Sequence, residues 1–141
     1  MKKYKVGYTQ GVYDMFHVGH LNLLNRAKEQ CEYLIVGVNS DELVESYKHK
    51  NPVICQENRM QIVANIKAVD QVSLAFTLDK MQAFQELKFD AIFIGDDWKG
   101  HPRWEATRLE MQEVGVDVVF LPHTDGVSST KLSSVLDQHE M

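Results

Sequence analysis

The stretch GVYDMFHVGH, residues 11–20, decides the fold that we expect for the rest of the chain. An apolar run at residues 4–9 precedes it and reads as a strand, and residues 19–30 follow with the spacing of an amphipathic helix. A loop between a strand and a helix brings backbone N–H groups and the positive end of the helix dipole to one point, where phosphate binds well. His17 and His20 would both face such an anion. The stretch therefore predicts a nucleotide-phosphate site at the edge of an α/β sheet.

The length and charge of the chain narrow the classes of protein to consider. Its 141 residues fit a single domain, residues 1–141, with 44% hydrophobic and 25% charged residues. The net charge of -5 argues against general binding to nucleic acid or to an anionic membrane surface. Cys31 and Cys55 lack the spacing of a metal knuckle or a redox pair, which favours free thiols. The N-terminal apolar run is too short for a signal peptide or a membrane span, so we expect a cytoplasmic protein.

Strand and helix patterns alternate along the whole chain. Strands are expected at residues 4–9, 33–38, 70–75, 90–94 and 116–121, and helices at 19–30, 41–47, 56–68, 79–88, 102–114 and 128–138. The run YLIVGV at 33–38 is continuously apolar, which indicates burial on both faces of a parallel sheet. This alternation predicts an α/β fold, a Rossmann-like three-layer sandwich with a five-stranded parallel sheet. Ligands of such sheets bind at the carboxyl ends of the strands.

Several candidate residues have a structural interpretation beside the functional one. The two histidines can cap the following helix, and Asp41 is either a helix N-cap or a ribose ligand. A lysine-rich loop at residues 48–50 is usually solvated, and Trp98 fits a core position as well as a base contact. In the helix expected at 56–68, an inner face is predicted for Met60, Ile62, Val63 and Ile66.

Four motifs in this order resemble the small cytidylyltransferases of the HxGH nucleotidyltransferase superfamily. They are GVYDMFHVGH at 11–20, ENR at 57–59, GDDW at 95–98 and TDGVSSTK at 124–131. The chain is most similar to the glycerol-3-phosphate cytidylyltransferase family, over nearly its whole length. HxGH alone is moderately specific, whereas four motifs in register are a strong signal.

The resemblance implies roles for individual residues. His17 and His20 would contact the triphosphate and stabilise the transition state, while Lys48 and Lys50 would bind phosphates of both substrates. Asp14 would organise the first loop. Nucleotide contacts are implied for Thr9, Gln10, Gly11, Tyr13, Asp14, Gly19, Asp41, Arg59, Asp97, Trp98, His123, Val127, Ser128, Ser129 and Thr130.

The implied reaction suits these residue types. In-line attack by a phosphate oxygen on the α-phosphorus of a nucleoside triphosphate requires positioning and positive charge rather than a protein nucleophile. The attacking phosphate monoester is already ionised at neutral pH, so no general base is required. The resemblance implies a homodimer, with residues 65–72 near the partner, that joins CTP and sn-glycerol 3-phosphate into a CDP-alcohol and pyrophosphate. Mg²⁺ would bridge phosphate oxygens of the nucleotide, with no metal ligand assigned to the chain.

Two departures from the family pattern leave alternatives open. His123 and Lys67 stand where the family usually has arginine, and both exchanges lose bidentate geometry. An adenylyltransferase of the same fold, of FAD or sugar-phosphate type, therefore stays possible, as does a choline- or ethanolamine-phosphate enzyme. A catalytically silent nucleotide-binding module is the alternative from another class. A domain like those of aminoacyl-tRNA synthetases is disfavoured, since the chain is short, acidic and without a KMSKS-like loop.

Overall fold

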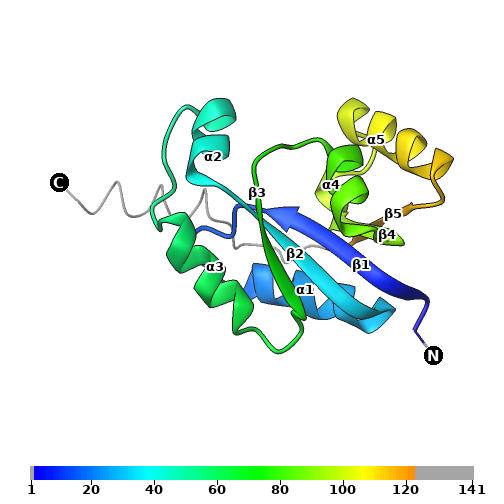
Figure 1. The fold of residues 1–141 in the computed structure, drawn as a ribbon, viewed down its shortest axis with the longest axis horizontal. Helices are drawn as coiled ribbons and strands as arrows, with labels where there is room; N and C mark the ends of the chain where they lie inside the picture. Colours follow the sequence, from blue (N-terminus) through cyan, green and yellow to red (C-terminus); the bar gives the residue numbers. More distant parts are fainter. Residues whose placement is uncertain (1, 123–141) are drawn as a thin grey trace.

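The computed structural model describes residues 2–122 (Figure 1). The strands are β1 Tyr4–Gly11, β2 Cys31–Asn39, β3 Gln71–Ala75, β4 Ala91–Gly95 and β5 Asp117–Leu121. The helices are α1 Val18–Gln30, α2 Asp41–Lys48, α3 Gln56–Ala64, α4 Lys80–Leu87 and α5 Pro102–Glu113, with a 3-10 turn, η1, at Asp96–Trp98. The helix predicted at 128–138 lies outside the described residues. None of the helices within residues 2–122 is long and apolar enough to cross a membrane.

All neighbouring strands are parallel, and their order in the sheet is β3-β2-β1-β4-β5. The chain moves outward from β1 through β2 to β3, then returns to the other side of β1 for β4 and β5. The order therefore reverses beside β1, and a crevice forms outside the carboxyl ends of strands at such a switch point. The predicted α/β fold with a five-stranded parallel sheet is confirmed.

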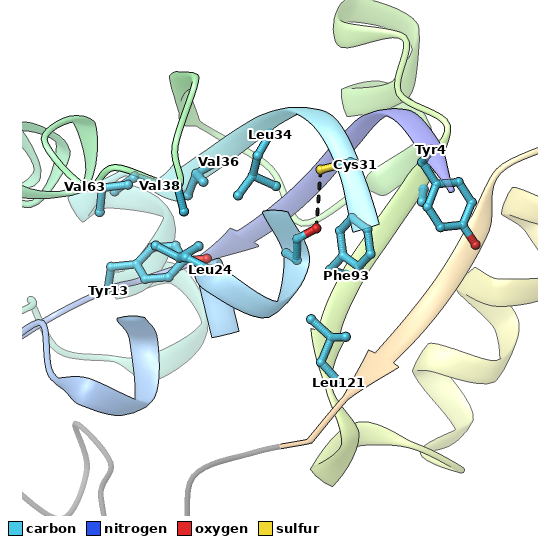
Figure 2. Packing of buried hydrophobic residues seen from close by; sticks show 13 residues of the cluster. Tyr4, Tyr13, Leu24, Cys31, Leu34, Val36, Val38, Val63, Phe93 and Leu121 are labelled. Carbon is cyan, nitrogen blue, oxygen red and sulfur yellow. Dashed lines mark hydrogen bonds between the residues drawn. The ribbon is translucent and has the colours of Figure 1, made fainter. Parts of the chain in front are cut away.

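Helices cover both faces of this sheet. In Figure 1, α1 and α3 lie on one face, and α4 and α5 lie on the other. Figure 2 shows the core under α1 and α3, where Leu24 and Val63 pack against Val36 of β2. Ile35 belongs to the core on the opposite face, together with Phe89. Because successive side chains of β2 enter different cores, the strand has a continuously apolar run at residues 33–38.

The helix predicted at 56–68 ends earlier than expected, at Ala64. Beyond it, Ile66 N–H donates to Val63 O and Val69 N–H donates to Ile66 O, so short turns replace the helix and return the chain to the core. The inner face predicted for this helix was also wrong at Ile62, which is 39% exposed. Arg59 and Val63, four residues apart, are the buried pair, and Ile62 lies one residue off their stripe.

Candidate active site

A cleft of about 970 Å³ opens at the carboxyl edge of the sheet. Residues from the ends of β1, β2 and β4 meet there with the beginnings of α1, α4 and α5. The predicted site residues that line it are Thr9, Gln10, Gly11, Tyr13, Asp14, His17, Gly19, His20, Lys48, Lys50, Asp97 and Trp98. The fold thus brings together residues that lie up to 89 positions apart in sequence, from Thr9 to Trp98.

The other predicted site residues fall into two groups. Asp41 and Arg59 do not line the cleft. His123, Val127, Ser128, Ser129 and Thr130 lie outside the described residues.

His17 and His20 form the capping box of α1. His17 is the N-cap: its Nδ1 accepts a hydrogen bond from Gly19 N at 3.0 Å. His20 Nδ1 accepts from His17 N at 3.2 Å, and the two rings stack with their centroids 3.9 Å apart. Since Nδ1 of each ring is an acceptor, the proton of each neutral imidazole must be on Nε2. The capping geometry therefore turns both rings into Nε2–H donors.

Their protonation state follows from burial. Burial lowers the pKa of His17 below its ordinary value. Burial, reinforced by the neighbouring His17 ring, lowers the pKa of His20 to about 4. Both rings are thus neutral at pH 7. His17 Nε2 is buried and has no hydrogen-bond partner among the described residues, in a side chain that lines the cleft. An unpaired buried N–H is costly unless a ligand satisfies it, so this atom marks a place for an acceptor oxygen.

The loop before these histidines is held in an unusual backbone conformation. Tyr13 and Met15 both have positive φ values, 56° and 49°. Residues other than glycine and asparagine rarely adopt this backbone region. Between them, Asp14 accepts hydrogen bonds from Val53 N at 2.7 Å and Ile54 N at 2.9 Å. The carboxylate therefore ties the histidine loop to the segment that follows the lysines at 48 and 50.

Arg59, for which a nucleotide contact was predicted, directs its hydrogen bonds to the protein. Its side chain is 0% exposed and donates to Ile54 O, Val12 O and Asn39 O at 2.7–2.9 Å. It also forms an ion pair with Asp41 at 2.6 Å. The guanidinium joins the ends of β1 and β2 to the loop before α3.

Asp41 is occupied by the same network. Its second carboxylate oxygen accepts from Gln56 N at 3.2 Å, and Gln56 Oε1 accepts from Asp41 N. The interpretation of Asp41 as the N-cap of α2 was wrong, because Ser40 fills that position and its hydroxyl accepts from Leu43 N.

Lys48 and Lys50 are exposed at the rim of the cleft. His49 between them ends α2 with a left-handed φ of 60°. On the other half of the edge, η1 presents Asp97 and Trp98. Trp98 is 40% exposed and its ring meets His101 edge-on at 5.2 Å, so its position is at the cleft wall and not in the core.

The sequence analysis missed Lys80, a cleft residue with a buried side chain. Its Nζ donates to Leu78 O at 2.8 Å and lies 5.4 Å from the centroid of the Trp104 ring. Burial, with a smaller contribution from Arg103, lowers the pKa of Lys80 to about 8. One signal in the sequence was available. A lysine in the first turn of a helix interacts unfavourably with the helix dipole, so its presence there indicates a role other than stabilising the helix. Asn39 and Tyr47, which also line the cleft, were missed as well.

Comparison with known proteins gives the family. The chain matches the Cytidylyltransferase-like family over residues 8–134. It is 36% identical over 125 residues to the glycerol-3-phosphate cytidylyltransferase of Bacillus spizizenii, covering 88% of this chain and 91% of that protein. It is 32% identical over 129 residues to the enzyme of the same name from Staphylococcus aureus, covering 91% and 92%.

A solved structure agrees with this assignment. The lipopolysaccharide core biosynthesis protein from Thermoplasma volcanium superposes with a TM-score of 0.75 at 26% identity, covering 86% of this chain and 99% of that one. The match over residues 8–134 includes the HxGH motif, the ENR and GDDW segments and the whole of TDGVSSTK. The chain is therefore a member of the cytidylyltransferase-like family and an enzyme of the nucleotidyltransferase type.

Proposed function

We propose that this enzyme transfers a cytidylyl group from CTP to an alcohol phosphate, with sn-glycerol 3-phosphate as the acceptor, to give CDP-glycerol and pyrophosphate. The observation that carries the proposal is the pair of neutral Nε2–H donors of His17 and His20 in the cleft, with the unpaired His17 Nε2. The relatives from Bacillus spizizenii and Staphylococcus aureus, which match over most of both chains, are named for this activity.

The reaction needs charge stabilisation at one phosphorus atom. An oxygen of the acceptor phosphate forms a bond to the α-phosphorus of CTP, and the bond from that phosphorus to its bridging oxygen breaks. Pyrophosphate leaves with the electron pair. Negative charge grows on the non-bridging and leaving oxygens, where the two imidazole N–H groups would donate hydrogen bonds. Because the capping box holds both rings in place, they need no reorganisation as the charge develops.

Cationic side chains would hold the two anionic substrates in line. Lys48 and Lys50 stand at the rim, and Lys80 and Arg103 line the wall nearer to α4 and α5. A chain with a net charge of -5 gathers these four cations at one edge, which is the local positive cluster that two phosphorylated substrates require. With Asp97 and Trp98 taking the nucleotide on the β4 side, the acceptor would lie on the β2–β3 side, and the histidines between them.

Mg²⁺ would enter this site with the triphosphate. Among residues 2–122 no three His, Cys, Asp or Glu side chains gather as metal ligands. Mg²⁺ in nucleotide enzymes is commonly held by substrate phosphates and retained waters, with few protein ligands, and this donor set fits that arrangement. The ion would neutralise phosphate charge while the side chains of the cleft orient the substrates.

The proposal includes a homodimer in the cytoplasm. An open groove on α3 and the turn after it, formed by Ile54, Ile62 and Ile66 with amide side chains, lies beside the edge strand β3. Residues 65–72 border this face. A second copy of the chain would cover the exposed Ile62 side chain there.

The experiment is a matrix of nucleotides and acceptors. Purified protein with Mg²⁺ is incubated with CTP, ATP, UTP or GTP and with glycerol 3-phosphate, choline phosphate, ethanolamine phosphate or a sugar 1-phosphate, and pyrophosphate release is followed. We expect turnover with CTP and glycerol 3-phosphate. Turnover with ATP alone would replace the cytidylyl assignment by the adenylyltransferase alternative, for which the histidine at position 123 leaves room. Nucleotide binding without pyrophosphate release would identify a silent module.

A further inference from the structure

A chain of hydrogen bonds runs beneath the β2–β3 side of the cleft and ends at Tyr47. Tyr8 Oη donates to Gln10 Oε1 at 2.7 Å, and Gln10 Nε2 donates both to Thr77 O and to Asn39 Oδ1, each at 2.9 Å. Asn39 Nδ2 then donates to Tyr47 Oη at 3.1 Å. Tyr8 and Asn39 are buried at 1% and 3% exposure, whereas Tyr47 is half-buried in the cleft wall.

A backbone carbonyl sets the donor-to-acceptor direction of every hydrogen bond in this relay, the chain that runs from Tyr8 through Gln10 and Asn39 to Tyr47. Thr77 O can only accept, so the amide nitrogen of Gln10 must face it. The same nitrogen then meets the oxygen of the Asn39 amide, which leaves the Asn39 nitrogen to face Tyr47. Tyr47 Oη is consequently an acceptor toward Asn39, and its own hydrogen points elsewhere. No group among the described residues accepts that hydrogen.

The chemical character of this donor differs from that of its neighbours. Lys48 follows Tyr47 directly, and Lys80 lies in the same cleft lining. Ammonium groups attract any phosphate with little regard to what the phosphate is attached to, since they act as point charges. A neutral phenol held in one orientation makes a directional bond, which suits a hydroxyl oxygen on the carbon chain of the acceptor.

We propose that Tyr47 is a specificity-determining residue of the acceptor site, donating its hydroxyl hydrogen to a carbon-borne hydroxyl group of the alcohol phosphate. This inference rests on the proposed function, and it adds the chemical feature by which the enzyme would choose its acceptor. A site built to bond a substrate hydroxyl discriminates against an analogue that lacks it, because the protein donor would be left unpaired. Acceptors bearing hydroxyl groups beside the phosphate ester are therefore preferred over plain alkyl phosphates.

The test compares two three-carbon acceptors, sn-glycerol 3-phosphate and n-propyl phosphate, with CTP and Mg²⁺. In Tyr47→Phe we expect kcat/KM for glycerol 3-phosphate to fall about tenfold, the value of one lost hydrogen bond, with little change for propyl phosphate and in the KM for CTP. Tyr33→Phe is the matched control, since its hydroxyl donates to Gln71 at 2.8 Å away from the cleft. The preference is a ratio measured in one protein sample, so partial loss of folding does not alter it.

A second variant tests the relay without removing the phenol. Asn39→Asp replaces the amide donor by a carboxylate, toward which the Tyr47 hydrogen would turn. We expect this variant to lose the preference for glycerol 3-phosphate as Tyr47→Phe does. If Tyr47→Phe keeps the wild-type preference for glycerol 3-phosphate over propyl phosphate, the role of Tyr47 is overturned and the proposed function stands. The same follows if the wild-type enzyme uses both acceptors equally well. Failure of the wild type to use CTP with any alcohol phosphate would overturn the proposed function, and the role of Tyr47 with it.

Discussion

Two buried cations, Arg59 and Lys80, stand at the carboxyl edge of the sheet, and their hydrogen bonds differ in number and direction. Arg59 uses four of its five N–H groups on Ile54 O, Val12 O, Asn39 O and Asp41. Lys80 has one hydrogen bond, to Leu78 O, and lines the cleft. Both side chains are buried, so burial does not distinguish their roles. A cation whose N–H groups are nearly all hydrogen-bonded to the protein stabilises the fold. A cation with N–H groups that bond no protein atom can donate them to a ligand.

The largest expected effect is on folding, in Arg59→Met. The substitution leaves three carbonyl oxygens and the Asp41 carboxylate without their partner, and breaking a buried pair costs about 3–5 kcal/mol. Urea unfolding measures this loss. Arg108→Met is the control, because Arg108 pairs with Glu105 at the surface, where such a pair contributes about 0–1 kcal/mol. A stable Arg59→Met protein with a raised KM for CTP would return Arg59 to the nucleotide site.

The next effect separates capping from chemistry at His17. Asparagine is a good N-cap, so His17→Asn keeps an acceptor for Gly19 N but loses the Nε2–H donor; His17→Ala loses both. We expect both variants to lower kcat by about 10²-fold. In thermal unfolding, His17→Ala should lose about 1 kcal/mol more than His17→Asn.

His101→Asn is the control for this pair of variants. His101 caps α5 in the same way, through Arg103 N, and lies outside the cleft lining. Its kcat should match the wild type. Near-normal kcat in His17→Asn would remove His17 from the mechanism and leave it as a helix cap.

Lys80→Met should affect substrate use and spare the fold. We expect kcat/KM to fall about tenfold at pH 7, as for one lost charge-assisted hydrogen bond, with stability equal to or above that of the wild type. Lys5→Met, an exposed lysine at the opposite end of β1, is the control. A variant that unfolds while its residual activity stays normal would place Lys80 with Arg59, as a structural cation.

The pH dependence of the wild type sharpens this test. The pKa of Lys80 is lowered to about 8 in the fold, against about 10.4 in an unfolded chain. Above pH 8 the folded protein loses the Lys80 charge, so kcat/KM should decline toward that of Lys80→Met. Between pH 8 and 10.4 the unfolded chain binds more protons at this site than the folded one, so the contribution of Lys80 to stability rises with pH. Parallel kcat/KM profiles for the two proteins would contradict the assignment.

The smallest effect concerns the exposed lysine loop. His49→Gly removes a side chain held at φ 60°, and we expect about 0.5–1 kcal/mol of added stability. Lys88→Gly, at φ 53° at the end of α4, should gain as much away from the cleft. A gain in Lys88→Gly without one in His49→Gly would mean that the rim lysines tighten the loop by contacts of their own.

The sequence predicted the fold and the position of the histidine pair because both depend on local pattern. Strand and helix periodicity defines the sheet, and His17 and His20 lie within one turn of α1. The sequence could not predict which ring nitrogen carries the proton, because this follows from the hydrogen bonds that each Nδ1 accepts in the structure. Arg59 shows the same limit: the ENR motif gives its residue type, whereas the saturation of its donors depends on carbonyls from three separate segments.

Tyr47 and Lys80 could not be found by motif because neither residue belongs to one of the four motifs that identified the site. Tyr47 reaches the cleft from the end of α2 and Lys80 from the beginning of α4. That they line one cleft with Gln10 and Asn39 depends on the order of the strands. The direction of the hydrogen bonds from Tyr8 to Tyr47 is set by the Thr77 carbonyl. This is a backbone atom, so no pattern of side chains in the sequence predicts it.

The capping box at the start of α1 constrains how this protein can evolve. A helix cap is ordinarily exchangeable, because several small polar residues serve equally well. Here the same two rings begin the helix and, under the proposed chemistry, meet the reacting phosphate. A lineage that drifted to a serine or asparagine cap would keep its fold and lose its reaction, so selection for activity also preserves this helix start. Under the proposed role of Tyr47, new acceptors would be accommodated on the β2–β3 side, where Tyr47 can vary without disturbing the first helix.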